Sequence, residues 1–187
     1  MKKSTYNLIV TILALVIVIG GGTLLYQNLG SRVALPEATV QETVDPTAET
    51  APDFSVMDAS EGVYSLSDFR GTPVLLNFWS SSCPPCLSEM PLFQTAWEEY
   101  GDQVQFMIVN LTDGYNDTFS SAMEVIEENG YTFPVFFDTE SEGAYAYGIR
   151  SIPMTYFIDE NGVVVKEHLG MLTEATLEAG IRSILPD

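Results

Sequence analysis

Two cysteines separated by two prolines are the residues of this sequence best suited to chemistry. Cys83 and Cys86, in the run Cys83-Pro84-Pro85-Cys86, are the only cysteines among the 187 residues. They follow the apolar segment 74–79 and precede a segment with helical periodicity. A strand that delivers such a pair to the start of a helix is typical of a thiol–disulfide exchange site. As a structural crosslink the pair would be poor, because so small a loop removes little entropy from the unfolded chain.

The position of each cysteine predicts its part in the exchange. We expect Cys83 to be the attacking thiolate, because the helix N-terminus stabilises negative charge, and Cys86, one turn later, to be the resolving thiol. Pro84 and Pro85 carry no N–H group, so Cys86 is the first residue after Cys83 that can donate a backbone hydrogen bond to its sulfur. We therefore predict that the pKa of Cys83 is lowered only modestly, which favours a reductant.

Metal binding is the main alternative use of the two thiols. A closed zinc site needs four ligands, whereas this chain offers two cysteines and a single histidine, His168. We interpret His168 as a surface residue. The sequence thus predicts no metal site and no cofactor beyond a redox-active Cys83–Cys86 disulfide.

The elements that would position the pair alternate between strands and helices. Residues 74–79 are predicted to form a buried strand, apolar except for Asn77, and residues 86–100 an amphipathic helix. The other predicted elements are a hairpin at 54–65, a turn at 67–71, strands at 104–110 and 135–137, helices at 117–129 and 144–147, a hairpin of strands 154–158 and 163–166, and a last helix after Thr173 that runs to 185. This order indicates an α/β fold with a mixed sheet covered by helices on both faces.

The N-terminal segment has the composition of a membrane anchor. Residues 6–26 carry no charge, follow Lys2 and Lys3, and are long enough as a helix to span a bilayer core. The two lysines would stay in the cytoplasm, which places the rest of the chain outside. A cleaved signal peptide begins in the same way, but no clean cleavage site follows the apolar stretch. We predict a transmembrane anchor at 1–30, a flexible acidic linker at 31–50 and one folded domain at 51–187.

Charge limits the partners of the folded part. After residue 32 the chain holds four basic and 26 acidic residues, a formal charge of −22. Such a body is repelled by nucleic acids and by anionic lipid surfaces. Solubility in an extracytoplasmic or saline medium is the simplest reason for this charge.

Several motifs in order resemble the membrane-anchored thioredoxin-like family that includes the TlpA and ResA type proteins. The resemblance covers residues 51–185 and is carried by the domain opening at 51–54, the approach to the site at 66–79, the cysteine helix with Glu89-Met90-Pro91, and the loop at 147–153. The resemblance implies a thioredoxin fold with an N-terminal hairpin extension. Residues 112–138 resemble the helix-and-strand insertion that separates this family from plain thioredoxin.

The resemblance also implies roles for single residues. Glu89 would be the active-site acid that moves the proton of Cys86, although a first-turn acid that only complements the helix dipole remains an alternative. Asn77 stands where thioredoxin has a buried Asp, and Ser82 where the family commonly has a large residue. Pro153 is a candidate cis-proline whose preceding residue, Ile152, would pair with an extended client, unless the bond is an ordinary trans one. We expect Trp79 to pack beneath the redox loop, and the client to bind over Trp79, Pro84, Pro85, Ile152 and Pro153.

The function implied is a thiol–disulfide oxidoreductase tethered to the bacterial cell membrane with its catalytic domain outside. It would take electrons from a membrane thiol donor and reduce a disulfide in a client protein. Apocytochrome c, as in cytochrome c-type biogenesis, is the family's best-known client; an extracellular methionine sulfoxide reductase or peroxidase is a comparable one. The alternatives are an oxidase that installs disulfides and, with less support, a copper chaperone of the Sco type, which uses a three-residue cysteine spacing and a distant histidine.

Overall fold

The computed structural model describes residues 50–186 of the chain. The predicted anchor at 1–30, and all of the predicted linker at 31–50 except Thr50, lie outside these residues. Thr50 forms an antiparallel bridge with Val163 and so pairs with the folded part. No helix within residues 50–186 is both long and apolar enough to cross a membrane.

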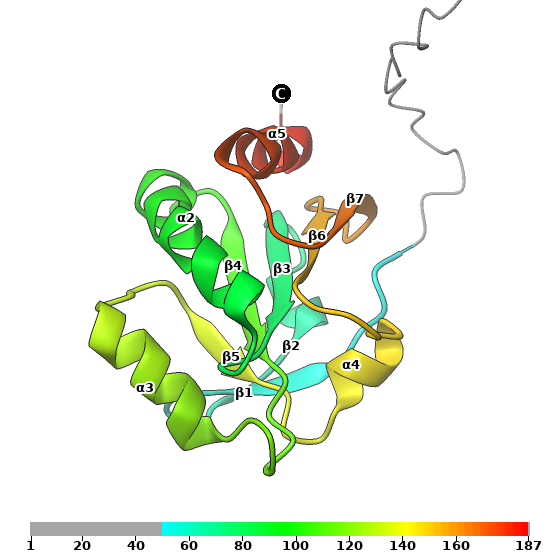
Figure 1. Ribbon diagram of the computed structural model, residues 1–187. Helices are drawn as coiled ribbons and strands as arrows, with labels where there is room; N and C mark the ends of the chain where they lie inside the picture. The colour runs from blue at the N-terminus through cyan, green and yellow to red at the C-terminus, as the bar shows by residue number, and fades with distance from the viewer. Residues whose placement is uncertain (1–49, 187) are drawn as a thin grey trace, which may run out of the picture. The chain divides into compact units, whose positions relative to one another are not determined.

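Residues 50–186 form one seven-stranded mixed sheet with helices on both faces (Figure 1), which confirms the predicted fold class. The strand order is β2-β1-β5-β4-β3-β6-β7. β3 is parallel to β4 and antiparallel to β6. The elements are β1 (Ser55–Asp58), β2 (Val63–Ser65), the 3-10 helix η1 (Leu66–Phe69), β3 (Val74–Trp79), α2 (Pro84–Tyr100), β4 (Gln105–Asn110), α3 (Phe119–Asn129), β5 (Val135–Phe137), α4 (Glu142–Ala146), β6 (Met154–Ile158), β7 (Val164–Leu169) and α5 (Glu174–Ile184).

The central strand β3 is buried along its whole length, as its apolar run predicted. Side chains alternate between the two faces of a strand. Leu75 and Trp79 therefore join the core beneath α2, α3 and α5, whereas Leu76 and Phe78 join the core on the face covered by η1 and α4. Asn77 lies on the same face as Leu75 and Trp79, so β3 places one polar side chain under α2.

Helix α2 begins at Pro84, two residues earlier than its apolar periodicity predicted. Both prolines fit into the first turn because the N–H groups there have no partner within the helix. Cys83 becomes the N-cap residue, with extended backbone angles. The helix ends at Tyr100, before Gly101, as predicted.

β5 and β6 have their predicted bounds, and the remaining elements differ from theirs by a few residues. The predicted turn at 67–71 is largely the 3-10 helix η1. Helix α3 begins at Phe119 and not at residue 117, because Thr118 is its N-cap and accepts a hydrogen bond from the N–H of Ser121. It ends at Asn129 as predicted, and a φ of 66° places the following Gly130 in the left-handed region. The loop before α3 contacts the turn between β3 and α2, because Asp117 accepts hydrogen bonds from Ser81.

Candidate active site at the junction of β3 and α2

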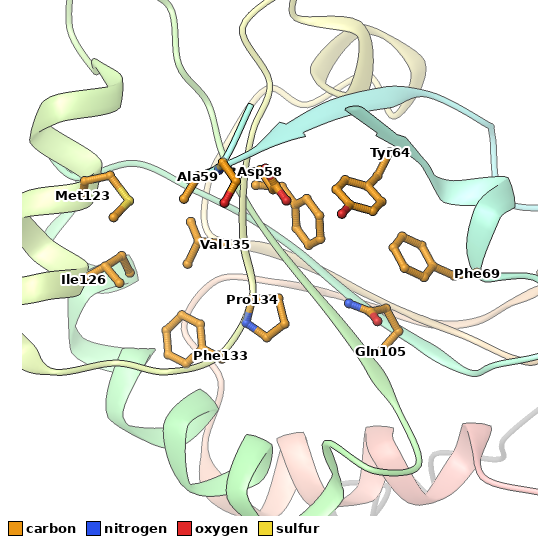
Figure 2. A pocket seen from close by; sticks show the side chains of 12 residues that line it. Asp58, Ala59, Tyr64, Phe69, Gln105, Met123, Ile126, Phe133, Pro134 and Val135 are labelled. Carbon is orange, nitrogen blue, oxygen red and sulfur yellow. Dashed lines mark hydrogen bonds between the residues drawn. The ribbon is translucent and has the colours of Figure 1, made fainter. Parts of the chain in front are cut away.

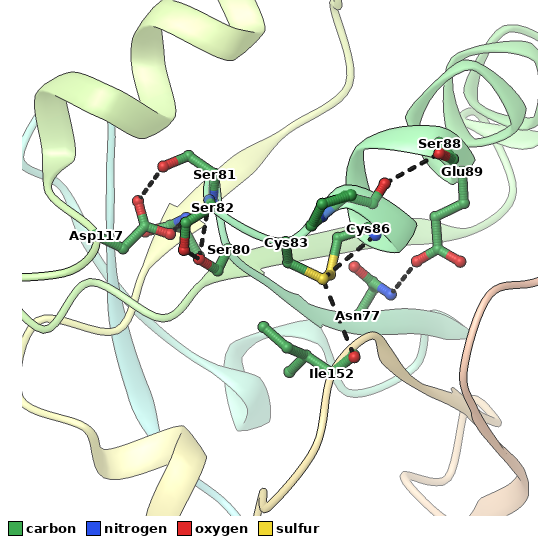
Figure 3. The surroundings of a disulfide bond; sticks show 12 residues. Asn77, Ser80, Ser81, Ser82, Cys83, Cys86, Ser88, Glu89, Asp117 and Ile152 are labelled. Carbon is green, nitrogen blue, oxygen red and sulfur yellow. Dashed lines mark hydrogen bonds between the residues drawn. A yellow bond between two sulfur atoms is a disulfide. The ribbon is translucent and has the colours of Figure 1, made fainter.

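Cys83 and Cys86 form a disulfide at the start of α2 (Figure 3). Their Cα atoms lie 5.3 Å apart. Cys83 is partly exposed, whereas Cys86 has no exposed surface and packs into the core beneath the helix. The outer sulfur is therefore the one that an approaching sulfur atom can reach, which agrees with the predicted order of attack.

The N-cap position gives Cys83 a single backbone donor from the first turn. Its Sγ accepts a hydrogen bond from the N–H of Cys86 at 3.3 Å. An N-cap side chain commonly accepts from the second or third helical residue, and here the second is Pro85, which has no N–H. The carbonyl oxygen of Ile152 lies 4.0 Å from the same sulfur, so the loop before β6 borders the disulfide.

The loop at Ile152 and Pro153 has the predicted cis peptide bond. Ile152 is partly exposed beside Cys83, whereas the side chain of Pro153 is buried. The carbonyl oxygen of Pro153 accepts a hydrogen bond from the N–H of Gly170 at 2.9 Å. Of these two residues, Ile152 offers a surface to a client.

Glu89 lies one helical turn after Cys86 and is fully buried. Its Oε1 accepts a hydrogen bond from Asn77 Nδ2 at 3.1 Å, and its Oε2 accepts from the N–H of Leu172 at 2.9 Å. Burial raises the pKa of Glu89 from 4.5 to about 7, although both hydrogen bonds act in the opposite direction. A carboxyl group with such a pKa exchanges its proton at neutral pH.

Two partners in this network were not foreseen from the sequence. Asn77 Nδ2 also donates to Thr155 Oγ1 at 3.0 Å, and Thr155 is fully buried in β6. The one threonine within the apolar segment 154–158 was the available signal. The hydrogen bond from the N–H of Leu172 could not be predicted from the sequence, because nearly every residue type has a backbone N–H group. Asn77 thus connects β3 to α2 through Glu89 and to β6 through Thr155.

The pKa of Glu89 predicts a pH-dependent part of the free energy of unfolding. Because the folded protein holds this proton more tightly than the unfolded chain, the contribution is complete below pH 4.5 and is lost as the pH rises through about 7. Its size is about 3 kcal/mol. Glu89→Gln cannot ionise, so relative to the wild type its free energy of unfolding should rise by about this amount between pH 4.5 and pH 8. Denaturant titrations of both oxidised proteins across this range measure the difference.

The matched control is Glu98→Gln, which removes an equal charge from an exposed position of α2. The difference between Glu98→Gln and the wild type should change with pH much less than the difference for Glu89→Gln, because Glu98→Gln leaves the buried carboxyl group in place. Parallel pH curves for Glu89→Gln and the wild type would contradict the raised pKa of the buried Glu89.

The client surface predicted from the sequence is only partly available. Pro84 and Pro85 are exposed beside the disulfide, as a contact surface requires. Trp79 has no exposed surface and belongs to the core cluster that contains Cys86, so it packs beneath the redox loop and offers no contact to a client. Its assignment to substrate binding is corrected by this burial, and the same holds for the side chain of Pro153.

His168 lies on the edge strand β7, which β6 separates from β3, the strand that leads to the cysteines. It is on β7 opposite Thr155, is partly buried, and its Nε2 is 3.4 Å from the carbonyl oxygen of Met171. His168 is therefore a partly exposed surface residue, as predicted. Within the described residues no group of three histidine, cysteine or acidic side chains is placed to hold a metal ion.

A separate pocket of about 420 Å³ lies between the β1–β2 hairpin, α3 and β5 (Figure 2). Tyr64 and Phe69 line one part of it, and Met123, Ile126 and Phe133 line another. None of the predicted site residues lines this pocket. This pocket is therefore distinct from the junction of β3 and α2, where the cysteines lie.

Comparisons with known proteins agree with this geometry. Residues 47–167 match the family described as AhpC/TSA. Thiol-disulfide oxidoreductase ResA of Geobacillus thermodenitrificans is 30% identical over 187 residues, which cover 100% of both chains. Thioredoxin-like protein YneN of Bacillus subtilis is 34% identical over 151 residues, 81% of this chain and 85% of YneN.

A solved structure supports the same assignment. StoA from Bacillus subtilis has a TM-score of 0.61 and 29% sequence identity, over 71% of this chain and 98% of StoA. The resemblance inferred from the motifs around the cysteines is thereby confirmed in sequence and in fold. This chain belongs to the AhpC/TSA family and, within it, to the thioredoxin-like thiol-disulfide oxidoreductases of the ResA type.

Proposed function

We propose that this protein reduces disulfides in client proteins outside the cytoplasm while its N-terminal segment holds it at the cell membrane. One observation carries the direction of the reaction: Cys83 Sγ has one backbone donor in the first turn of α2, the N–H of Cys86. Few donors stabilise a thiolate only weakly, and a weakly stabilised thiolate makes a dithiol a stronger reductant.

The proposed reaction proceeds by two exchanges. The Cys83 thiolate attacks one sulfur of the client disulfide, so a mixed disulfide forms and the other client sulfur leaves as a thiolate. The Cys86 thiol then gives up its proton, and its sulfur attacks Cys83. The Cys83–Cys86 disulfide forms and the second client thiolate leaves. Two electrons have passed to the client, and a membrane dithiol that becomes a disulfide would restore the starting state.

Glu89 is the proposed acceptor of the Cys86 proton. It lies on the buried side of α2, one turn from Cys86, and its pKa of about 7 suits a group that takes a proton at neutral pH. The hydrogen bonds from Asn77 and Leu172 hold its two oxygens in fixed positions. The network thus supports a proton-transfer role over the alternative of a helix acid that only complements the dipole.

Pro85 has no N–H group, and restoring one tests whether the protein reduces or oxidises its clients. Pro85→Ala supplies an N–H at the second helical position, where it can bond to the Cys83 thiolate. We expect this variant to raise the midpoint potential by roughly 30 mV, since one added bond to a charged group is worth about 1.5 kcal/mol. The wild-type potential should lie nearer −270 mV than −120 mV on the scale of known enzymes. Equilibration with glutathione or dithiothreitol buffers measures both values.

The control is Pro84→Ala, which restores an N–H at the first helical position. That group is not a usual partner of the N-cap side chain, so the potential should stay near the wild-type value. A wild-type potential near −120 mV would favour the oxidase and would contradict the proposal.

The proposal includes a membrane tether at the N-terminus and a particular class of client. The uncharged segment 6–26 after two lysines supports the tether, and the formal charge of −22 after residue 32 supports an exported, soluble domain. Apocytochrome c is the proposed client, and an extracellular methionine sulfoxide reductase or peroxidase is the other. Protease treatment of intact cells should degrade residues beyond 32 and leave the lysine end protected.

A further inference from the structure

Asp117, in the loop that leads into α3, is a buried carboxylate surrounded by hydrogen-bond donors. It is 2% exposed. Its Oδ1 accepts from the hydroxyl groups of Ser81 at 2.6 Å and Ser121 at 3.0 Å. Its Oδ2 accepts from the N–H of Ser81 at 2.6 Å and from Asn110 Nδ2 at 2.9 Å. Figure 3 shows Asp117 and Glu89 on opposite sides of the cysteine pair.

Ser81 belongs to the turn that delivers Cys83 to the helix. The N–H of Cys83 donates to the carbonyl oxygen of Ser80 at 3.1 Å, and the N–H of Ser82 donates to Ser80 Oγ at 3.2 Å. The turn is therefore closed on itself, and its middle residue, Ser81, is bonded twice to Asp117. Asp117 connects this turn to β4 through Asn110 and to α3 through Ser121.

We propose that Asp117 is a positioning residue for Cys83: it holds the turn so that Cys83 Sγ keeps its hydrogen bond to the N–H of Cys86. The inference rests on the proposed redox role of Cys83. Because the prolines leave this sulfur a single donor in the first turn, a small movement of Cys83 removes that stabilisation. The segment 112–138, which contains Asp117, thereby gains a function: it braces the redox turn.

A carboxylate near a thiolate also acts through its charge, and the two effects differ in sign. The charge raises the pKa of a nearby thiol, so its removal would lower the pKa of Cys83. Loss of the turn would raise that pKa, because the thiolate would lose its donor. The neighbouring acids are Asp113, which accepts a hydrogen bond from the N–H of Asp117 at 3.0 Å, and Glu89 beyond the cysteines. Both stay unchanged in the variants below.

Two variants of Asp117 separate these effects. In Asp117→Asn the side-chain oxygen can face the N–H of Ser81 and Asn110 Nδ2, while the NH₂ group faces two hydroxyl groups that can accept. This variant removes the charge and keeps the turn attached. Asp117→Ala removes both the charge and the attachment.

The experiment is the alkylation of the reduced, full-length protein by iodoacetamide as a function of pH. We expect Asp117→Ala to raise the pKa of Cys83 by about one unit. Well below the pKa, this lowers the alkylation rate about three- to fourfold, because the thiolate fraction falls tenfold while its intrinsic nucleophilicity rises. Asp117→Asn should leave the pKa of Cys83 at or below the wild-type value. Equal shifts in both variants, or a lowered pKa in Asp117→Ala, would overturn the proposal.

If Asp117→Ala does not fold, a second pair of variants tests whether the bonds between Asp117 and the turn lower the pKa of Cys83. Ser81→Ala removes the hydroxyl bond between the turn and Asp117 and should raise the pKa of Cys83. Ser121→Ala removes a donor to Asp117 and the capping bond from the N–H of Thr118, but leaves both bonds between Ser81 and Asp117, so the pKa of Cys83 should not rise. Equal pKa values in these two would overturn the proposal. The result is independent of the client, because iodoacetamide reacts with the thiolate directly. Failure of the wild type to reduce protein disulfides would instead contradict the proposed function.

Discussion

Cys83→Ser should abolish the reduction of protein disulfides. A serine hydroxyl is not ionised at neutral pH and cannot form a disulfide, so the first exchange has no nucleophile. Cys86 cannot replace it, because its sulfur has no exposed surface. We expect the rate of insulin reduction, with dithiothreitol as the recycling reductant, to fall at least about a thousandfold, to that of dithiothreitol alone.

The neighbouring Ser82→Ala is the control for this loss. Ser82 is exposed, and among residues 50–186 its hydrogen bonds are to Ser80 within the turn, so its replacement should leave most of the activity. Residual turnover by Cys83→Ser above the dithiothreitol background would show that another group attacks the client. The proposed assignment of Cys83 would then be wrong.

Cys86→Ser should stop the reaction after the first exchange. The donor to Cys83 Sγ is the backbone N–H of residue 86, which the substitution keeps, so the Cys83 thiolate remains stabilised. The serine hydroxyl cannot resolve the mixed disulfide, which therefore accumulates. Each protein molecule should release one client thiol, and steady turnover should fall at least about a hundredfold.

Mass spectrometry of the accumulated species measures this result and identifies the client at the same time. In extracts, the attached peptide should come from a protein with a paired-cysteine site. The double variant Cys83→Ser with Cys86→Ser should yield no adduct. Full turnover by Cys86→Ser would mean that a free thiol of the medium, and not Cys86, resolves the intermediate.

The sequence predicted the frame of the site because strong local patterns specify it. Strands β3, β5 and β6 were predicted with their observed bounds, since each is a mainly apolar run that follows a proline and ends before a polar residue. The start of α2 was missed by two residues, because prolines in a first helical turn do not interrupt the helix but hide its beginning. Local rules thus placed the cysteines at the correct junction of strand and helix.

Contacts between distant parts of the chain could not be predicted in the same way. Asp117 bonds to Ser81 across 36 residues, and Thr155 bonds to Asn77 across 78. Each pair depends on which strands become neighbours, and no periodicity in the sequence contains that information. For Trp79 the sequence predicted both packing beneath the redox loop and contact with a client. Its complete burial bears out the first and excludes the second, because a fully buried ring offers no surface to a client.

The two sulfurs differ in access: Cys83 is partly exposed and attacks the client, whereas Cys86 is buried and acts only in the second exchange. The most direct test reduces the wild-type protein, exposes it briefly to limiting iodoacetamide at pH 7, and maps the modified residue by mass spectrometry. We predict that Cys83 carries nearly all of the label and that Cys86 is modified only after unfolding. Equal labelling of the two cysteines, or labelling of Cys86 first, would contradict the account.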